Sequence, residues 1–182
     1  MSILAWVLLA LAAVLAVYIV VLINRFVRYE NAIANAWAQI DVQLQRRGEL
    51  IPNLVETVKG YAKHEKATIQ AVSDARARMV GAQDPEAKME ANDLLGAALG
   101  RLFAVSEAYP DLKANTNFLQ LQDELSHTEN KVAFARQHYN DAVLRFNNAI
   151  QTYPAKVFAG SRTAKPMLSV PEASKAVPVV KF

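Results

Sequence analysis

The stretch NTNFLQLQDELSHTENKVAFARQHYNDAVLRFNNAIQTY, residues 115–153, decides the fold that the sequence predicts. Within it, apolar and small residues recur at alternating spacings of three and four, with no slip in phase. The row consists of Phe118, Leu121, Leu125, Thr128, Val132, Ala135, Tyr139, Ala142, Phe146, Ala149 and Tyr153. This spacing is typical of one helix that presents a coiled-coil seam. At 1.5 Å per residue the helix would be roughly 60 Å long, which favours a rod over a compact globule.

A second helix is predicted upstream, over residues 85–107. The residues 81–85, Gly-Ala-Gln-Asp-Pro, interrupt the helical pattern before it. Asp84 is suited to cap the new helix, with Pro85 at its first position. The expected apolar face consists of Leu94, Leu95, Ala98, Leu99, Leu102 and Phe103. The sequence Tyr-Pro-Asp at 109–111 then predicts a turn or a short break before the long helix.

Further upstream, residues 33–79 carry two apolar rows with heptad spacing. One row is Ile33, Ile40, Leu54, Tyr61 and Ala75, and the other is Trp37, Leu44, Ile51, Val58, Val72 and Met79. The phase of these rows does not slip at Pro52. The pattern therefore predicts a single amphipathic helix with a kink near Gly48–Pro52, since proline removes one backbone donor and strains the preceding turn.

The residues 3–23 form an apolar stretch without a charged residue. Its length is about that needed to cross a hydrocarbon core of ~30 Å as a helix. Trp6 and Tyr18 lie toward its two ends, where aromatic rings tend to sit among headgroups. A cleaved signal peptide fits less well, because no basic residue precedes the stretch and no small-x-small cleavage site follows it. The sequence predicts an uncleaved transmembrane anchor.

The flanking charges predict the orientation of this anchor. Arg25 and Arg28 follow it directly, whereas the N-terminal side has only its α-amino group. The positive-inside rule then places the following domain in the cytoplasm, although a periplasmic or extracellular domain stays open. No helix breaker separates Ile23 from the first seam residue, Ile33. We therefore expect the anchor and the first soluble helix to be one continuous element.

The expected organisation is a transmembrane anchor over residues 1–24, a helical domain over 25–154 and a C-terminal tail over 155–182. After Pro154 the helical pattern stops, and the tail is predicted to be extended or partly disordered. Its last residues, 177–182, could lie extended against a neighbour. The fold class is all-α, with an N-terminal transmembrane helix followed by an elongated, antiparallel, coiled-coil-like bundle of long helices.

The composition excludes several kinds of site. The 182-residue chain has no cysteine, so disulfides, thiol catalysis and cysteine-ligated metals are excluded. A formal net charge of +3, with basic and acidic residues interleaved, gives no case for nucleic-acid binding. Glu124 and His127 form one Glu-x-x-His, whereas di-metal bundles use two such motifs and two further carboxylates. We therefore predict no metal, no cofactor and no catalytic residue, and a solvated pair at Glu124 and His127.

One charged residue occupies a seam position. Arg47 interrupts the first apolar row, and polar seam residues often fix register or partner number. Its partner could be Asp41, Glu49 or Glu124, depending on the packing. The alternative is an arginine whose stem covers apolar surface while its head reaches water. With Arg46, Pro52 and Asn53, Arg47 forms a cluster of candidate structural or interaction residues.

Several motifs carry a resemblance to a known family. They are WAQIDVQLQRR at 37–47, LIPNLV at 50–55, VKGYAKHE at 58–65, RLFAV at 101–105, EAYPDLKAN at 107–115, and TENKVAFAR at 128–136 with YND at 139–141. Together they resemble the LemA family from the anchor to about Pro154. The chain departs from the family in its tail, with Gly-Ser-Arg at 160–162 where members often carry a Gly-Phe pair. The resemblance implies a bacterial membrane protein with an all-helical antiparallel domain and no established enzyme activity.

These motifs add five candidate structural or interaction residues: Tyr61, Tyr109, Pro110, Asn130 and Tyr139. The function expected is that of a single-pass, non-enzymatic protein of the bacterial inner membrane. It would self-associate as an oligomeric scaffold, because long heptads and leftover apolar strips favour partners. The alternative is an adaptor that docks another membrane or signalling protein. The expected partners are the lipid bilayer and further copies of the chain.

Overall fold

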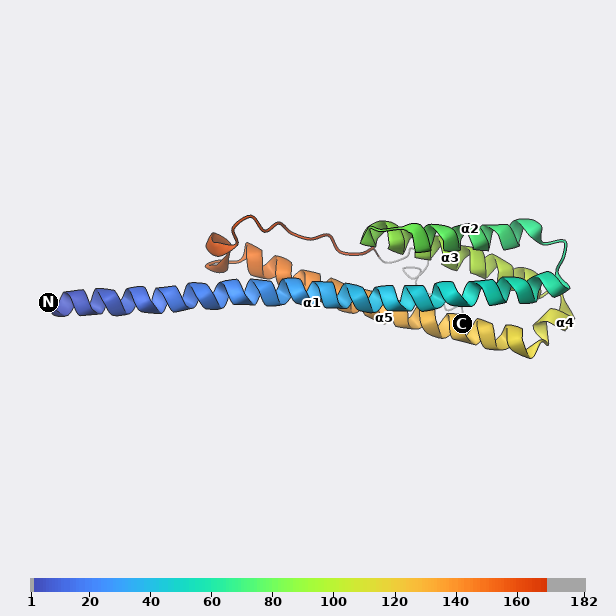
Figure 1. The fold of residues 1–182 in the computed structure, drawn as a ribbon, viewed down its shortest axis with the longest axis horizontal. Coiled ribbons are helices and arrows are strands. Elements are labelled where there is room, and N and C mark those ends of the chain that lie inside the picture. Colours follow the sequence, from blue (N-terminus) through green and yellow to red (C-terminus); the bar gives the residue numbers. More distant parts are fainter. Residues whose placement is uncertain (1, 170–182) are drawn as a thin grey trace, which may run out of the picture. The chain divides into compact units, whose positions relative to one another are not determined.

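The computed structural model describes residues 2–169, which form helices and their connections without a strand (Figure 1). The α-helices are α1 (Ile3–Tyr61), α2 (Lys66–Gly81), α3 (Pro85–Ser106), α4 (Pro110–Lys113) and α5 (Thr116–Gln151), and η1 (Ala155–Phe158) is a 3-10 helix. This confirms the predicted all-α fold class. The described residues group into two compact units, the first comprising 2–36 and 137–167 and the second 37–136 and 168–169.

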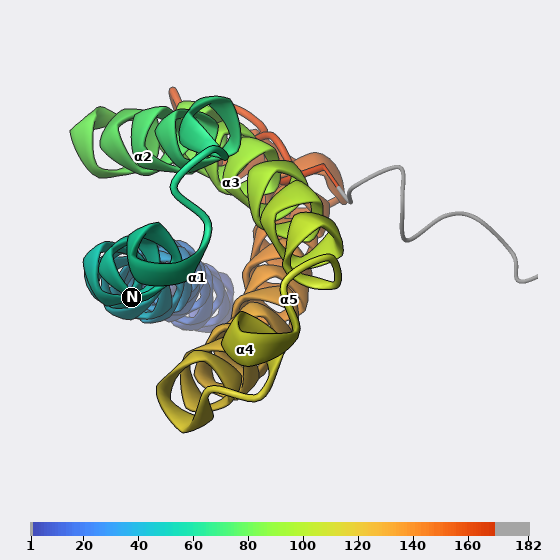
Figure 2. The same ribbon diagram turned by 90° about the vertical axis from the view of Figure 1, so that its right-hand side faces the viewer.

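The second unit is an antiparallel bundle built from the C-terminal part of α1, from α2, α3 and α4, and from the N-terminal part of α5. Figure 2 shows these helices from the end at which α1 stops and α4 lies. Buried apolar side chains from all of them form the core. They include Ile40, Leu44, Ile51, Leu54, Val58, Val72, Met79, Leu95, Leu102, Leu112, Phe118, Leu125 and Val132. The Phe103 and Phe118 rings meet edge to face, with centroids 6.0 Å apart.

Two helices of the bundle begin at side-chain caps, of which the cap at Asp84 was predicted. The Asp84 carboxylate accepts hydrogen bonds from the amides of Glu86 and Ala87, both at 3.0 Å, and Pro85 is the first residue of α3. The side chain of Asn115 accepts from the amide of Phe118 at 3.0 Å, which caps α5. The boundaries of these helices therefore follow from local sequence signals.

The prediction of one helix over 33–79 is wrong, because α1 ends at Tyr61 and α2 begins at Lys66. The chain reverses between them, over residues 62–65. The apolar rows continue in phase because α2 folds back and buries Ile69, Val72, Ala75 and Met79 in the same core that α1 lines. Periodicity alone cannot distinguish a continued helix from a second helix with the same buried face.

The predicted apolar face of α3 needs a smaller correction. Leu94 is 46% exposed, whereas Asn92 is fully buried. The helix is rotated so that Asn92 reaches a charged partner inside the bundle. The long C-terminal helix also ends earlier than predicted. It stops at Gln151 and not at Tyr153, and the predicted seam residue Tyr153 is exposed.

The first unit packs the N-terminal part of α1 against the C-terminal part of α5. Its buried residues include Leu22, Phe26, Ile33, Tyr139, Val143, Phe146 and Ile150. After η1, residues 159–167 have no regular secondary structure but lie against both helices. Arg162 donates to Glu30 at 3.0 Å, and its guanidinium lies 5.2 Å from the centre of the Phe26 ring. Asn147 exchanges two hydrogen bonds of 2.9 Å with the backbone of Lys165.

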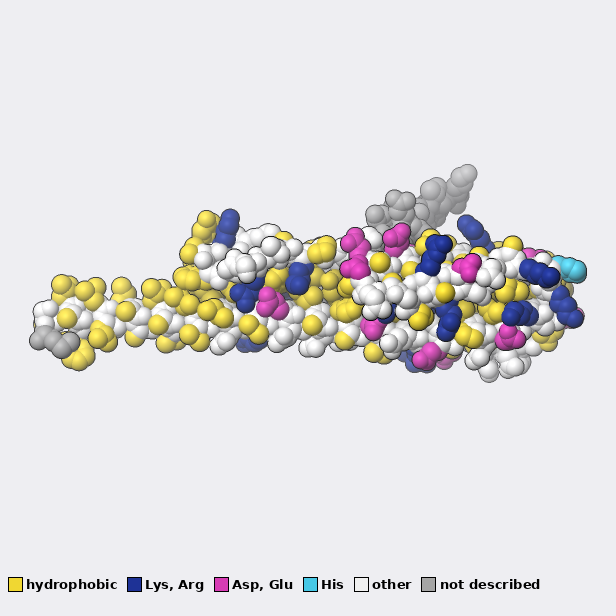
Figure 3. Space-filling model, turned by 45° about the horizontal axis from the view of Figure 1, so that its top comes forward, with side chains coloured by type: hydrophobic (Ala, Val, Ile, Leu, Met, Phe, Trp, Pro, Cys, Tyr) yellow, Lys and Arg dark blue, Asp and Glu magenta, His cyan; other side chains and the backbone are white. Residues whose placement is uncertain are grey.

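The N-terminal part of α1 is apolar and almost wholly exposed. Figure 3 shows hydrophobic side chains around the whole visible face of this segment. Among residues 2–169, α1 is the one helix long and apolar enough to cross a membrane, and only 6% of its most apolar 18-residue window is buried. The helix continues without interruption between Ile23 and Ile33, which confirms the expected continuous element. The segment 177–182 lies outside the described residues.

Candidate functional site

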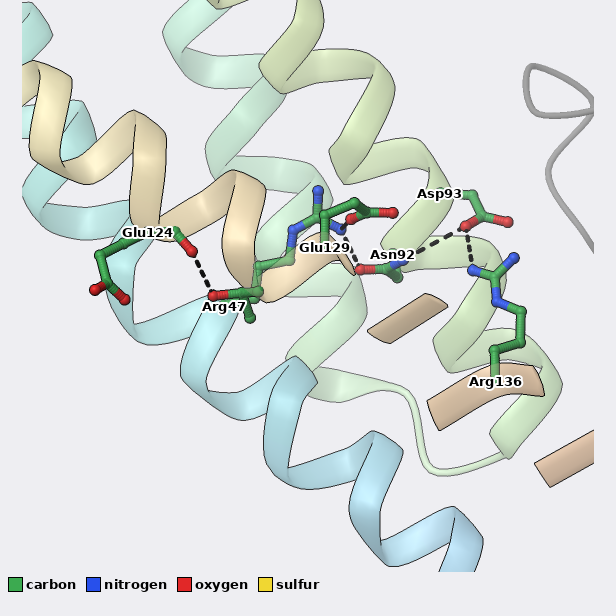
Figure 4. A network of polar contacts seen from close by, with 7 residues as sticks. Arg47, Asn92, Asp93, Glu124, Glu129 and Arg136 are labelled. Carbon is green, nitrogen blue, oxygen red and sulfur yellow. Dashed lines mark hydrogen bonds and ion pairs between the residues drawn. The ribbon is translucent and has the colours of Figure 1, made fainter. Parts of the chain in front are cut away.

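A buried polar network crosses the core of the second unit (Figure 4). At its centre is Arg47 of α1, whose residue surface is only 3% exposed. Its guanidinium donates to the amide oxygen of Asn92 on α3 and forms an ion pair with Glu129 on α5. One side chain therefore joins three helices inside a mainly apolar core.

The network continues from Asn92 toward the end of the described chain. The amide of Asn92 donates to Asp93 at 3.4 Å, and Asp93 accepts from Arg136 of α5 at 2.8 Å. Arg136, itself buried, also donates to the carbonyl oxygen of Ser169 at 2.9 Å. The two buried arginines thus link α1, α3, α5 and the segment that follows the first unit.

Burial and pairing act in opposite directions on Arg47. Desolvation lowers the pKa of its guanidinium, and the charges of Glu129 and Asp93 offset this effect only in part, so the pKa stays lowered. An arginine starts from a pKa so high that it stays protonated at neutral pH. The network can therefore join and align helices, but Arg47 does not exchange protons in this range. A buried pair of this kind adds little net stability, because the cost of desolvation offsets much of the attraction between the charges.

The partner of Arg47 is none of the three carboxylates considered from the sequence. Asp41 pairs with Lys88, and Glu124 pairs with Arg46 at 2.9 Å. The Arg46 pair is about half exposed on both sides. Adjacent arginines in the sequence therefore have opposite environments, one in the core and one at the surface.

Pro52 and Asn53 occupy the next turn of α1. The helix passes through Pro52, and the carbonyl oxygen of Gly48, which Pro52 cannot bond, accepts a hydrogen bond from Arg76 of α2 at 2.7 Å. Asn53 is exposed. It lines a shallow cleft of about 400 Å³ together with Glu124 and other polar residues of α1 and α5.

Tyr61, Tyr109 and Pro110 gather at the end of the bundle where α1 stops. The Tyr61 hydroxyl accepts from the side chain of Asn115 at 3.0 Å. The Tyr109 hydroxyl donates to Glu65 at 3.1 Å, and this hydrogen bond is the main reason why the pKa of Tyr109 is raised. Pro110 is the first residue of α4. These tyrosines hold together the connections that close this end.

Asn130 and Tyr139 do not join these groups. Asn130 is exposed on α5 in the second unit, whereas Tyr139 is buried in the first unit. Within residues 2–169 no three His, Asp or Glu side chains lie close enough together to hold a metal ion. Glu124 of the Glu-x-x-His motif pairs with Arg46, and His127 is exposed.

Sequence reasoning missed Asp93, Glu129 and Arg136, and gave Asn92 no particular place. The spacing carried a usable signal. Glu129 and Arg136 flank Val132 at positions i−3 and i+4, and Val132 is a seam residue. Charged residues on a buried stripe need partners on a neighbouring helix. Which helix provides them depends on the packing, and the sequence does not contain that information in local form.

These features define a class: all-helical bundle proteins with one N-terminal helix that is apolar and long enough to cross a membrane. The model of the LemA family matches residues 36–182. The chain belongs to the LemA family.

Two relatives illustrate the range of similar proteins. The chain is 28% identical to Protein LemA of Metamycoplasma hominis over 131 residues, which cover 71% of this chain and 60% of that protein. It is also 28% identical to the magnetosome protein MamQ of Magnetospirillum gryphiswaldense over 158 residues, which cover 72% of this chain and 58% of that protein. The chain thus matches about three fifths of the length of these relatives.

Proposed function

We propose that this protein is a single-pass, non-enzymatic scaffold of the bacterial inner membrane, in which helical bundles associate laterally with further copies of the chain. The N-terminal part of α1 anchors the protein, and the second unit provides the contact between copies. Anchoring, orientation and lateral association are supported by different residues.

Anchoring is supported by the exposed apolar surface of α1. Side chains such as Leu4, Val7 and Leu11 are each more than half exposed, and no other part of the described chain covers them. In water this surface would be unfavourable by about 25 cal/mol per Å². A bilayer removes that cost, and a helix satisfies all its own backbone hydrogen bonds there.

Orientation rests on Arg25 and Arg28, which follow the apolar stretch. Arginine at this place favours the cytoplasmic side. With this orientation the bundle is cytoplasmic and the N-terminus lies outside the inner membrane.

Neither the names of the relatives nor the buried arginine network specifies a reaction, which supports a non-enzymatic role.

Lateral association is supported above all by Phe134, which is 73% exposed on α5. Leu119 and Asn130 lie on the same outer face of this helix as Phe134. At 3.6 residues per turn, the separations between these three residues place their side chains within about 60° of one another around the helix axis. Leu119 is 47% exposed. Asn130 lies one turn from Phe134, and Leu119 lies about 22 Å further along the same face. An exposed aromatic in a row with an amide and an apolar side chain suits a helix–helix contact.

Light scattering on the full-length protein in mild detergent tests this proposal. We expect a protein mass that is a multiple of the single chain, and a loss of mass in Phe134→Ser. Ala133→Ser is the matched control, because Ala133 is the neighbouring exposed residue on α5. A wild-type protein that is strictly monomeric would contradict the scaffold and favour an adaptor for a different membrane protein.

A further inference from the structure

A cleft of about 380 Å³ opens in the first unit, beside the residues that follow the apolar stretch of α1. Its polar lining consists of Arg25, Arg28 and Tyr29 from α1 and His138, Asp141 and Arg145 from α5. It is separate from the buried network, and one of its lining residues, Asp141, belongs to the YND motif at 139–141. Its lining has a strong excess of positive charge, with three guanidinium groups and one carboxylate.

Among the lining residues of this cleft, Asp141 is the one carboxylate that offsets the charge of the three arginines. Among residues 2–169, Arg25, Arg28 and Arg145 form no ion pair with a carboxylate, unlike Arg46, Arg47, Arg136 and Arg162. Arg25 instead donates to the Tyr29 hydroxyl at 2.9 Å and lies 5.5 Å from the centre of that ring. Its position is thereby restrained while its charge stays available to an anion.

The convergence of the arginines needs an explanation beyond membrane topology. Arg25 and Arg28 could act only as orientation signals, for which a place near the end of the span is sufficient. Arg145 lies far along the chain on α5, yet it lines the same cleft. Three arginines that line one space are typical of a phosphate site, since their planar donors match phosphate oxygens.

The depth of the cleft indicates where the phosphate comes from, and this step rests on the span proposed above. Arg25 and Arg28 follow Ile23 by two and five residues, which is about 3 and 8 Å along the helix axis. The headgroup layer beyond the hydrocarbon core is about 5–8 Å thick on each side. The cleft would therefore lie at the level of lipid headgroups.

The loop after α5 gives independent support for this depth. Tyr153 and Val157 are 76% and 68% exposed, and Lys156 lies 5.6 Å from the centre of the Tyr153 ring. Arg162 holds the following segment against Phe26 and Glu30 of α1, just beyond the apolar stretch. Exposed aromatic, aliphatic and basic side chains in one loop suit the membrane–water interface.

From these observations we infer that the cleft binds the phosphate group of an anionic phospholipid headgroup. Free phosphate presents the same chemistry, so the test has to separate the two sources. Full-length protein in mild detergent is titrated with fluorescent phosphatidylglycerol, with fluorescent diacylglycerol as the lipid that lacks phosphate, and with inorganic phosphate as a competitor. The variants are Arg145→Gln and, as the matched control, Arg101→Gln, an exposed arginine of α3.

The wild-type protein should bind phosphatidylglycerol more tightly than diacylglycerol. Arg145→Gln should weaken this binding about fivefold, the effect of one arginine at an anionic surface, and Arg101→Gln should leave it unchanged. Failure of millimolar inorganic phosphate to displace the lipid supports the lipid as the source. If inorganic phosphate displaces the lipid from the wild-type protein but not from Arg145→Gln, the phosphate site is supported and the lipid source is contradicted. Equal lipid binding by wild type and Arg145→Gln overturns the inference.

Extraction of membranes with alkaline carbonate separates this inference from the anchoring proposal. A protein released by carbonate would contradict the span of α1. Arg145-dependent binding of inorganic phosphate by that same protein would still support the cleft as a phosphate site. A protein that resists carbonate but binds lipid independently of Arg145 would support the membrane span of α1 and contradict the phosphate site.

Discussion

The Nε–H of Arg76 donates a hydrogen bond of 2.7 Å to the carbonyl oxygen of Gly48. In a regular α-helix the amide four residues later, at Pro52, would bond this carbonyl, but proline has no N–H. Gly48 is buried, so water does not replace the missing donor. The guanidinium of α2 therefore satisfies the backbone group that proline leaves free in α1, and it ties the two helices together at that turn.

Arg76→Met should lower the free energy of unfolding by about 1–2 kcal/mol, because it leaves a buried carbonyl without a donor. In the Pro52→Ala background the amide of residue 52 can bond Gly48, so the same substitution should cost clearly less. Urea denaturation of the detergent-solubilised protein, followed by helical circular dichroism, measures both. Equal costs in the two backgrounds would show that the hydrogen bond does not compensate for the proline.

Arg46 and Arg47 provide a matched pair of substitutions. Arg47→Met should lower the free energy of unfolding by about 2–4 kcal/mol, because Asn92 and Glu129 lose their buried partner. Arg46→Met should change it by less than about 1 kcal/mol, since the pair with Glu124 is half exposed. The same urea denaturation measures both variants, and equal effects would contradict the environments described.

Two glycines, Gly60 and Gly160, should respond in opposite ways to replacement by alanine. Gly60 lies in the last turn of α1 with open space around a Cβ, so Gly60→Ala should raise the free energy of unfolding by about 0.5–1 kcal/mol. Gly160 has φ +63°, a left-handed conformation, so Gly160→Ala should lower it by about 1–2 kcal/mol although nothing obstructs the Cβ. Thermal melting of the two variants beside wild type is sufficient, because the expected changes have opposite signs.

The hydrogen bond between Tyr109 and Glu65 should make the stability of the protein depend on pH in the alkaline range. Its hydroxyl donates to Glu65, which favours the neutral phenol and raises the pKa of Tyr109 in the folded state. The resulting stabilisation is fully present below the unfolded pKa of about 10 and is lost as the pH rises through the folded value. The difference in unfolding free energy between wild type and Tyr109→Phe should therefore shrink above pH ~10.

Glu65→Ala is the control for this prediction, because it removes the acceptor and keeps the phenol. In that background, replacing Tyr109 by phenylalanine should no longer change the pH dependence. An unchanged difference between wild type and Tyr109→Phe across the alkaline range would show that the hydrogen bond does not couple the titration to folding.

Local signals in the sequence predict much of this fold, and tertiary packing explains what they missed. Asp84, Pro85 and Asn115 act through their own backbone neighbours, so the starts of α3 and α5 were predictable. The reversal after Tyr61 was not, because α2 returns to the same core and keeps the apolar rows in phase. A loop of only four residues, 62–65, gave no proline or strong turn motif to contradict the continued pattern.

The candidate site was predictable in part for the same reason. The position of Arg47 in the seam left two interpretations open, a polar residue within the seam or an arginine whose head reaches water, and the structure shows it buried. The choice of Glu129 over Asp41, Glu49 or Glu124 depends on how α5 is placed against α1, which no local pattern encodes. Asn92 was not predicted to be buried, because Leu94 also lies near the apolar side of α3 and is the more apolar of the two. Only the packing determines which of them is buried.

The membrane span of α1 is tested most directly by labelling single cysteines, because the natural chain has none. The variants are Ser2→Cys, before the apolar stretch, and Ser126→Cys, at an exposed position of α5. With a maleimide that does not cross the inner membrane, Ser2→Cys should react in intact cells and Ser126→Cys only after permeabilisation. Reaction of both positions in intact cells, or of neither until permeabilisation, would contradict a helix that crosses the membrane and carries the bundle on its cytoplasmic side.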